Sequence, residues 1–220
     1  MLTWLLLSLT PPPAPPIAAP VDSVWYRAVL KRDVTGDRSP ETLIVEASGR
    51  RVDSLLVTFE IRSHGRRLYH EEWLTTWYFQ YDAPIDSMPE PVKYNRVFQH
   101  LRELLQPQNF APLDTVHGEE PWRPIPGDND DPRSSIAFHL KYTRVLDSLR
   151  LQHIDSATAE SRAREYAWSA PVDTAKIVDA WQALLRARPL TFTFYSGGEY
   201  IRTIVWSARL STFVVTFSCC

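Results

Sequence analysis

Polar and apolar residues alternate along the first third of the chain in the way that half-buried strands require. The clearest segment is 54–62, where one set of alternate positions is apolar and the other is mostly polar: Leu55, Val57, Phe59 and Ile61 against Thr58, Glu60 and Arg62. Other β-rich runs cover 24–32, 42–47 and 68–79, and Gly65 marks a turn before the last of them. This period of two predicts four strands joined by short turns, in an antiparallel meander.

The middle of the chain combines prolines with the period of a helix. Prolines are frequent between 84 and 126, so residues 84–131 are expected to be mostly loop. One helix is predicted within this stretch, over 92–106, with an apolar face made of Tyr94, Val97, Phe98, Leu101, Leu104 and Leu105. A second helix should start near Pro132 and run, with a break, toward Tyr166, and a third should span 173–187.

Alternation returns near the C-terminus, where strands are expected over 190–195, 200–207 and 212–218. Strands at both ends with helices between them indicate the α+β class. We expect one α+β domain over 21–220, with an antiparallel sheet built from the N-terminal and C-terminal meanders and covered by about three helices. The order of elements is not an alternating βαβ series, which disfavours a doubly wound nucleotide-binding fold.

Residues 1–20 have the pattern of an export signal or of an anchor. The apolar run at 2–9 is too short to span a bilayer as a helix, and small residues follow it. A proline follows each candidate cleavage site, Ala14 and Ala19, and should resist the peptidase. The alternative is an uncleaved anchor with a stiff proline-rich tether. Either way we expect an exported protein, periplasmic or secreted, whose contact with a membrane is confined to an uncleaved N-terminus.

Composition narrows the classes of partner. The chain has 220 residues, with 24 basic and 26 acidic side chains and a net charge of -2, so it lacks the basic field that nucleic-acid binding needs. The only cysteines, Cys219 and Cys220, are neighbours, and neighbouring cysteines seldom reach disulfide geometry. The core, or a bound ion, must therefore hold the domain together.

Oxygen-bearing side chains recur through the segment 33–41, between the first two predicted strands: Asp33, Thr35, Asp37 and, at its end, Glu41. Calcium takes six to eight oxygen ligands at about 2.3–2.6 Å, and a tight loop can supply several of them. Gly36 permits the sharp turn that such a loop requires. The alternative is a polar turn whose aspartates accept hydrogen bonds from backbone amides.

The segment 33–41 resembles the calcium loop of FG-GAP and VCBS-type β-propeller repeats, whose pattern is roughly Asp-x-Asp/Asn-Gly-Asp-Gly-x-x-Asp. The resemblance implies side-chain ligands at Asp33, Thr35, Asp37 and Glu41 and a structural calcium ion. The chain departs from the pattern at Thr35, at Glu41 and at Arg38, which stands where a glycine is usual. Because only this loop matches, the propeller fold is not implied.

Candidate catalytic residues are few. The chain contains neither a His-Glu-x-x-His zinc motif nor a Gly-x-Ser-x-Gly nucleophile motif. His70 and Glu72 share one face of a predicted strand, and His117 and Glu119 lie in the proline-rich stretch. If these four side chains converge, they could serve a hydrolase of envelope polymers. We regard a non-enzymatic role as the better interpretation.

Aromatic residues alternate along the fourth predicted strand: Tyr69, Trp73, Trp77 and Phe79. Exposed, this face could bind a carbohydrate or a peptide. Covered, it is part of the core, which we favour because the helices need a surface to pack on. The sequence therefore predicts a binding or structural domain of the envelope or the secreted fraction, with an unidentified protein or glycan partner and a structural calcium site.

Overall fold

The computed structural model describes residues 23–79, 85–113, 132–152, 154–167, 169–197 and 200–219. The predictions for residues 1–20, and those for His117 and Glu119, lie outside these ranges. The N-terminal strands are β1 (Ser23–Arg32), β2 (Glu41–Gly49), β3 (Leu56–Ser63) and β4 (Arg66–Leu74). The later strands are β5 (Phe110–Pro112), β6 (Leu190–Gly197), β7 (Tyr200–Ser207) and β8 (Thr212–Cys219). The α-helices are α1 (Glu90–Glu103), α2 (Pro132–Arg150), α3 (Ser156–Ala167) and α4 (Thr174–Ala187).

Short 3-10 helices connect some of these elements: η1 (Val52–Ser54), η2 (Thr75–Phe79), η3 (Ile85–Ser87) and η4 (Pro107–Asn109). The predicted α+β class is confirmed. The strands form two antiparallel sheets: sheet A has the order β1-β2-β3-β4 and sheet B the order β5-β6-β7-β8. The two meanders therefore form separate sheets, whereas the sequence pattern had predicted a single sheet built from both. Each has an apolar face, and stacking the sheets buries both faces at once.

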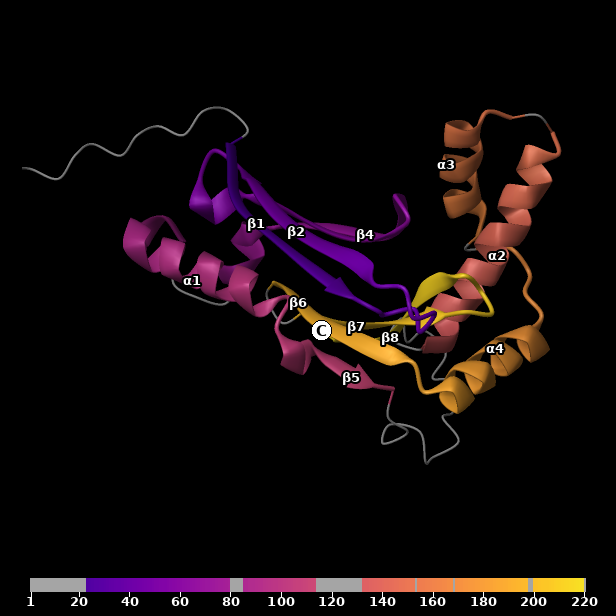
Figure 1. Cartoon of the computed structure of the whole chain (residues 1–220). Coiled ribbons are helices and arrows are strands. Elements are labelled where there is room, and N and C mark those ends of the chain that lie inside the picture. The colour runs from indigo at the N-terminus through magenta and orange to yellow at the C-terminus, as the bar shows by residue number, and fades with distance from the viewer. Residues whose placement is uncertain are drawn as a thin grey trace, which may run out of the picture.

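The core between the sheets is a layer of aromatic rings. Phe59 of β3 lies with its ring centroid 5.1 Å from that of Phe192 and 5.2 Å from that of Phe194, both in β6. An ion pair crosses the same space, with Arg202 Nη1 of β7 2.6 Å from Glu71 Oε1 of β4. Glu71 thus faces sheet B, whereas its neighbour Glu72 contacts His70 on the outer face of sheet A. Figure 1 shows the two sheets one over the other.

The aromatic residues predicted on the fourth strand belong mainly to this core. Tyr69 and Trp73 pack against the core, and Trp73 is only 3% exposed. The strand ends at Leu74, so Trp77 and Phe79 lie in η2, where Phe79 is buried and Trp77 is exposed. The core interpretation is confirmed. The exposed aromatic strand face required by a carbohydrate- or peptide-binding role is not present, because sheet B covers it.

Three of the α-helices gather at one end of the molecule (Figure 1). Val205 and Val214 of sheet B pack with Ile136 of α2 and with Ile177 of α4. Residue 205 points away from the neighbouring Ile204, which belongs to the core between the sheets, since successive side chains of a strand alternate. Sheet A, sheet B and the pair α2 and α4 thus form successive layers, and α3 packs on α2 through buried alanines.

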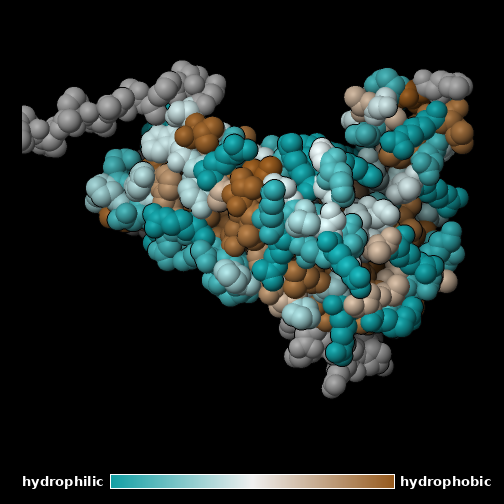
Figure 2. Space-filling model, viewed as in Figure 1, coloured by the Kyte–Doolittle hydropathy of each residue, from teal (hydrophilic) through white to brown (hydrophobic). Residues whose placement is uncertain are grey.

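The outer face of sheet A is largely polar. Glu60 of β3 accepts from Arg62 and lies close to Arg67 and His70, in agreement with the polar face predicted for this strand. In the view of Figure 2, hydrophilic residues predominate and hydrophobic ones form separate patches. In the part of the chain that the structure describes, no helix has both the length and the apolar character needed to cross a membrane.

Candidate functional site

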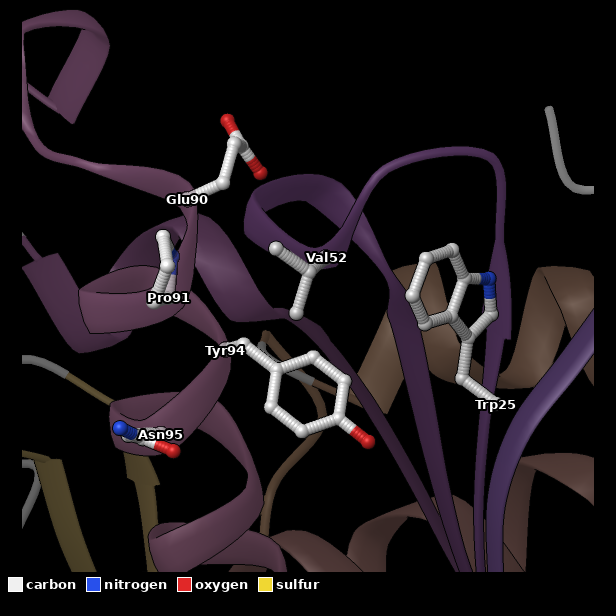
Figure 3. Close-up of a pocket in the computed structure, with 6 residues that line it drawn as sticks. All are labelled: Trp25, Val52, Glu90, Pro91, Tyr94 and Asn95. Atoms are coloured by element: carbon white, nitrogen blue, oxygen red, sulfur yellow. The ribbon is translucent and has the colours of Figure 1, made fainter. Parts of the chain in front are cut away.

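A groove lies between the start of β1 and the first turns of α1. Six residues line its volume of about 370 Å³: Trp25, Val52, Glu90, Pro91, Tyr94 and Asn95. Figure 3 shows the Trp25 indole on one side of the groove and the Tyr94 ring on the other, with Val52 next to the Tyr94 ring. Two aromatic side chains and a buried valine make a surface suited to binding an apolar or flat ligand.

A β-bulge places Trp25 in the groove. Val24 pairs with Ser48 and Tyr26 pairs with Ala47, so Trp25 is the extra residue of β1. A bulge changes the direction of a side chain without ending the strand. Trp25 and Tyr26, although consecutive, both pack against the same core, and the Tyr26 ring meets Phe98 of α1 edge-on at 6.1 Å. The bulge therefore directs Trp25 toward α1.

The indole ring of Trp25 is held by one hydrogen bond. Its Nε1–H donates to the carbonyl oxygen of Gly49 at 2.8 Å. Gly49 has φ of +150°, a conformation that side-chain-bearing residues rarely adopt, and a Cβ there would lie 3.3 Å from Leu55. The indole N–H is therefore occupied in positioning the ring, and the face of the ring is left to line the groove.

Tyr94 forms the opposite wall from α1. Its ring stacks on Phe98 with centroids 4.2 Å apart, and the residue is 46% exposed. The predicted apolar face of this helix is confirmed for its other members on α1, since Val97, Phe98 and Leu101 are buried. Tyr94 differs because it lies at the edge of that face, where one side of the ring packs and the other borders the groove.

A buried ion pair fixes α1 against η1 beside the groove. Lys93 Nζ lies 3.2 Å from Asp53 Oδ2 and 3.0 Å from Glu90 Oε1, and Arg51 makes two hydrogen bonds to the same aspartate. The hydrogen bond from Arg51 lowers the pKa of Asp53 despite its burial, and Lys93 adds to this effect. The hydrogen bond to Glu90, with that to Asp53, raises the pKa of Lys93. Both partners stay charged at neutral pH, so the walls of the groove are held in place before a ligand arrives.

The lining of the groove is more apolar and aromatic than polar. The polar groups that line the groove are Glu90, Asn95 and the Tyr94 hydroxyl, and Glu90 is engaged with Lys93. Within the described ranges, no group of three histidine, cysteine, aspartate or glutamate side chains is placed to hold a metal ion. The site was not predicted from the sequence. The one local signal was the pair Trp25–Tyr26, two aromatic residues in succession within an alternating strand.

The residues of the predicted calcium loop bind backbone amides of the loop itself. Asp33 accepts from the N–H of Gly36 at 2.7 Å and from that of Arg38 at 2.9 Å, and Asp37 accepts from the N–H of Ser39. Gly36 has φ of +78°, as the sharp turn requires. These are the hydrogen bonds of the polar turn that was the alternative to calcium.

Glu41 lies on the inner side of the same loop. It is fully buried and accepts from the N–H of Val34 at 2.9 Å, from the N–H of Thr35 at 3.2 Å and from the Thr35 hydroxyl at 3.0 Å. Oε2 accepts from both amides, which uses its two lone pairs, whereas Oε1 accepts only from the Thr35 hydroxyl and keeps one lone pair that an ion could share. Calcium at Asp33, Thr35, Asp37 and Glu41 stays a prediction.

Thermal melting tests the calcium prediction. An ion present at 100 times its dissociation constant stabilises a fold by about 2.7 kcal/mol, which raises Tm by several degrees. We expect millimolar calcium to raise Tm relative to excess chelator, and the variant Asp33→Ala/Asp37→Ala to lose that rise. Identical melting of the unchanged chain in calcium and in chelator would leave the loop as a hydrogen-bonded turn.

The predicted catalytic pair lies apart from the groove. His70 Nε2 is 3.1 Å from Glu72 Oε1, and His70 Nδ1 is 3.4 Å from Glu60 Oε1, on the outer face of sheet A. The pair is thus brought together, as its spacing on a strand predicts. The hydrolase hypothesis also needs His117 and Glu119, which lie outside the described residues.

The comparisons with known proteins add no family to this picture. No protein-family model, no curated protein and no solved structure matches the chain.

Proposed function

We propose that the chain is an exported, non-enzymatic binding domain that captures an envelope or secreted partner, a protein or a glycan, in the groove between β1 and α1. The observation that carries the proposal is the β-bulge that turns Trp25 toward Tyr94. When a bulge leaves a large aromatic residue partly exposed, the fold loses part of the stabilisation that full burial of the side chain would provide. Such a cost is typical of a residue kept for a ligand.

The rigidity of the groove supports the same proposal. The Trp25 indole is fixed by Gly49, Tyr94 is stacked on Phe98, and α1 is tied to η1 by Lys93 and Asp53. A ligand that enters a preformed site does not have to order its walls, so more of the contact energy appears as affinity. The proposed calcium ion in the loop 33–41 would have a structural role and is separate from this site.

Titration calorimetry of the whole chain with two defined probes tests the proposal. The probes are decaproline and a hexamer of N-acetylglucosamine, which represent an extended peptide and an envelope-type glycan. We expect one of them to bind, and Trp25→Ala and Tyr94→Ala each to weaken that binding by at least about tenfold, since aromatic residues at the centre of a site carry much of its affinity.

Trp77→Ala is the matched control. Trp77 is 43% exposed, close to the exposure of Tyr94, but it lies in η2 and does not line the groove. Its replacement should leave the affinity unchanged. If neither probe binds, or if Trp77→Ala weakens binding as much as Trp25→Ala does, the groove is not the binding site.

A further inference from the structure

The groove has the chemistry of a site for a proline-rich segment, and this chain contains one. We propose that the proline run at residues 11–16 of the chain itself is a ligand of the groove between β1 and α1, so that the domain is self-occupied until a competing partner displaces it. This inference rests on the proposed binding function and names the ligand class of the same site. The segment lies outside the described residues.

Hydrogen-bonding groups of the groove favour proline over sugar. The Trp25 indole N–H donates to Gly49 and Glu90 Oε1 is paired with Lys93, so Asn95 and the Tyr94 hydroxyl are the remaining polar groups of the lining. A sugar ring needs several hydrogen-bond partners for its hydroxyls, whereas proline has no backbone N–H and binds mainly through the faces of its ring. Proline-rich ligands are recognised by grooves lined with aromatic side chains, as this groove is with Trp25 and Tyr94.

The lack of charge on the segment also matches the balanced charges at the groove. The sequence of residues 11–20 is PPPAPPIAAP, which carries no charged side chain. The acidic groups at the groove are balanced, because Glu90 and Asp53 are paired with Lys93 and Arg51. An uncharged, apolar segment can therefore enter without leaving a charge unpaired, whereas a strongly charged ligand would find no opposite charge to meet.

The position of the segment in the chain makes the contact accessible. Residues 17–22 separate Pro16, the last residue of the dense proline run, from Ser23, where β1 starts. Six extended residues span about 20 Å, enough to turn back toward Trp25 at the start of the same strand. A short tether gives an effective concentration in the millimolar range, so even a weak intrinsic affinity leads to occupation. The prolines after Ala14 and Ala19 oppose cleavage there, which keeps the segment on the chain.

Competition between the tethered segment and a free copy tests the inference. The probe is the synthetic peptide PPPAPPIAAP, titrated by calorimetry into the unchanged whole chain and into a variant in which serine replaces Pro11, Pro12, Pro13, Pro15 and Pro16. We expect the variant to bind the peptide at least about tenfold more tightly, because the tethered copy no longer competes. Adding Trp25→Ala to the variant should remove the binding.

A control variant keeps the prolines and replaces Ala14, Ala18 and Ala19 by serine. It should still bind the peptide as weakly as the unchanged chain does. Equal affinity of the peptide for the unchanged chain and the proline variant would overturn self-occupation and leave the proposed binding function standing. If the N-acetylglucosamine hexamer binds in a Trp25-dependent way and the peptide does not bind, self-occupation is again overturned, and the groove is assigned to glycans. Binding of neither probe to any of these chains would overturn both proposals.

Discussion

Replacement of Phe59 by alanine is expected to lower the free energy of unfolding by about 3–5 kcal/mol, the range for a phenylalanine removed from a packed core. Phe59 is 1% exposed and touches rings from both sheets: Tyr69 of β4 at 5.8 Å, Phe192 at 5.1 Å and Phe194 at 5.2 Å between centroids. Its loss opens a cavity where the two sheets meet, and the surrounding rings relax only in part. Guanidinium unfolding followed by circular dichroism measures the change.

Leu56→Ala is the control for this prediction. Leu56 lies in the same strand, β3, and is 39% exposed. Its truncation should change the free energy of unfolding by less than about 1 kcal/mol, since a surface substitution removes little buried area. A Phe59→Ala variant that is as stable as Leu56→Ala would show that the stacked sheets do not form the main core.

Much of this fold follows from local sequence pattern. The alternation of Leu55, Val57, Phe59 and Ile61 identified the buried face of β3, and all four are buried, with Leu55 directly before the strand. The predicted helix at 173–187 corresponds to α4, with Asp173 as the N-terminal cap that accepts from the N–H of Ala175. These features depend on residues close in sequence, so their periods and caps can be recognised without any knowledge of distant contacts.

The relation between the two meanders was not predictable in the same way. The apolar residues of β6, such as Phe192 and Phe194, show that one face is buried but do not specify what buries it. Either a shared sheet covered by helices or two stacked sheets satisfies that pattern. The same limit applies to Trp77 and Phe79, whose spacing fits a strand although η2 places them on a 3-10 helix.

Predicting the groove from the sequence would require knowledge of contacts between residues that are even farther apart in the chain. Trp25 and Tyr94 are far apart in sequence and line the same groove only because α1 packs against β1 and η1. A helical period places Tyr94 on the apolar face, and only the packing shows that one side of its ring stays exposed. Lys93 and Asp53 illustrate the same point, since each is a polar residue that a pattern assigns to the surface and the structure buries.

Replacement of Glu41 by leucine should destabilise the protein by about 2–5 kcal/mol, because each buried amide left without an acceptor costs about 1–3 kcal/mol. The N–H groups of Val34 and Thr35 both donate to Glu41, and Val34 is itself buried. Glu41→Gln should cost less than Glu41→Leu, since a side-chain oxygen can still accept. Urea unfolding of the two variants gives the comparison.

Glu41 also distinguishes the two interpretations of the loop 33–41. If the hydrogen bonds of Glu41 hold the loop, the full cost of Glu41→Leu appears in excess chelator. If the predicted calcium ion holds it, the cost in calcium exceeds the cost in chelator, because the variant loses a ligand as well as an acceptor. Asp37→Ala is the control: this exposed residue caps one amide and should cost about 1 kcal/mol or less in chelator. A Glu41→Leu variant as stable as Asp37→Ala would mean that the buried amides have another acceptor.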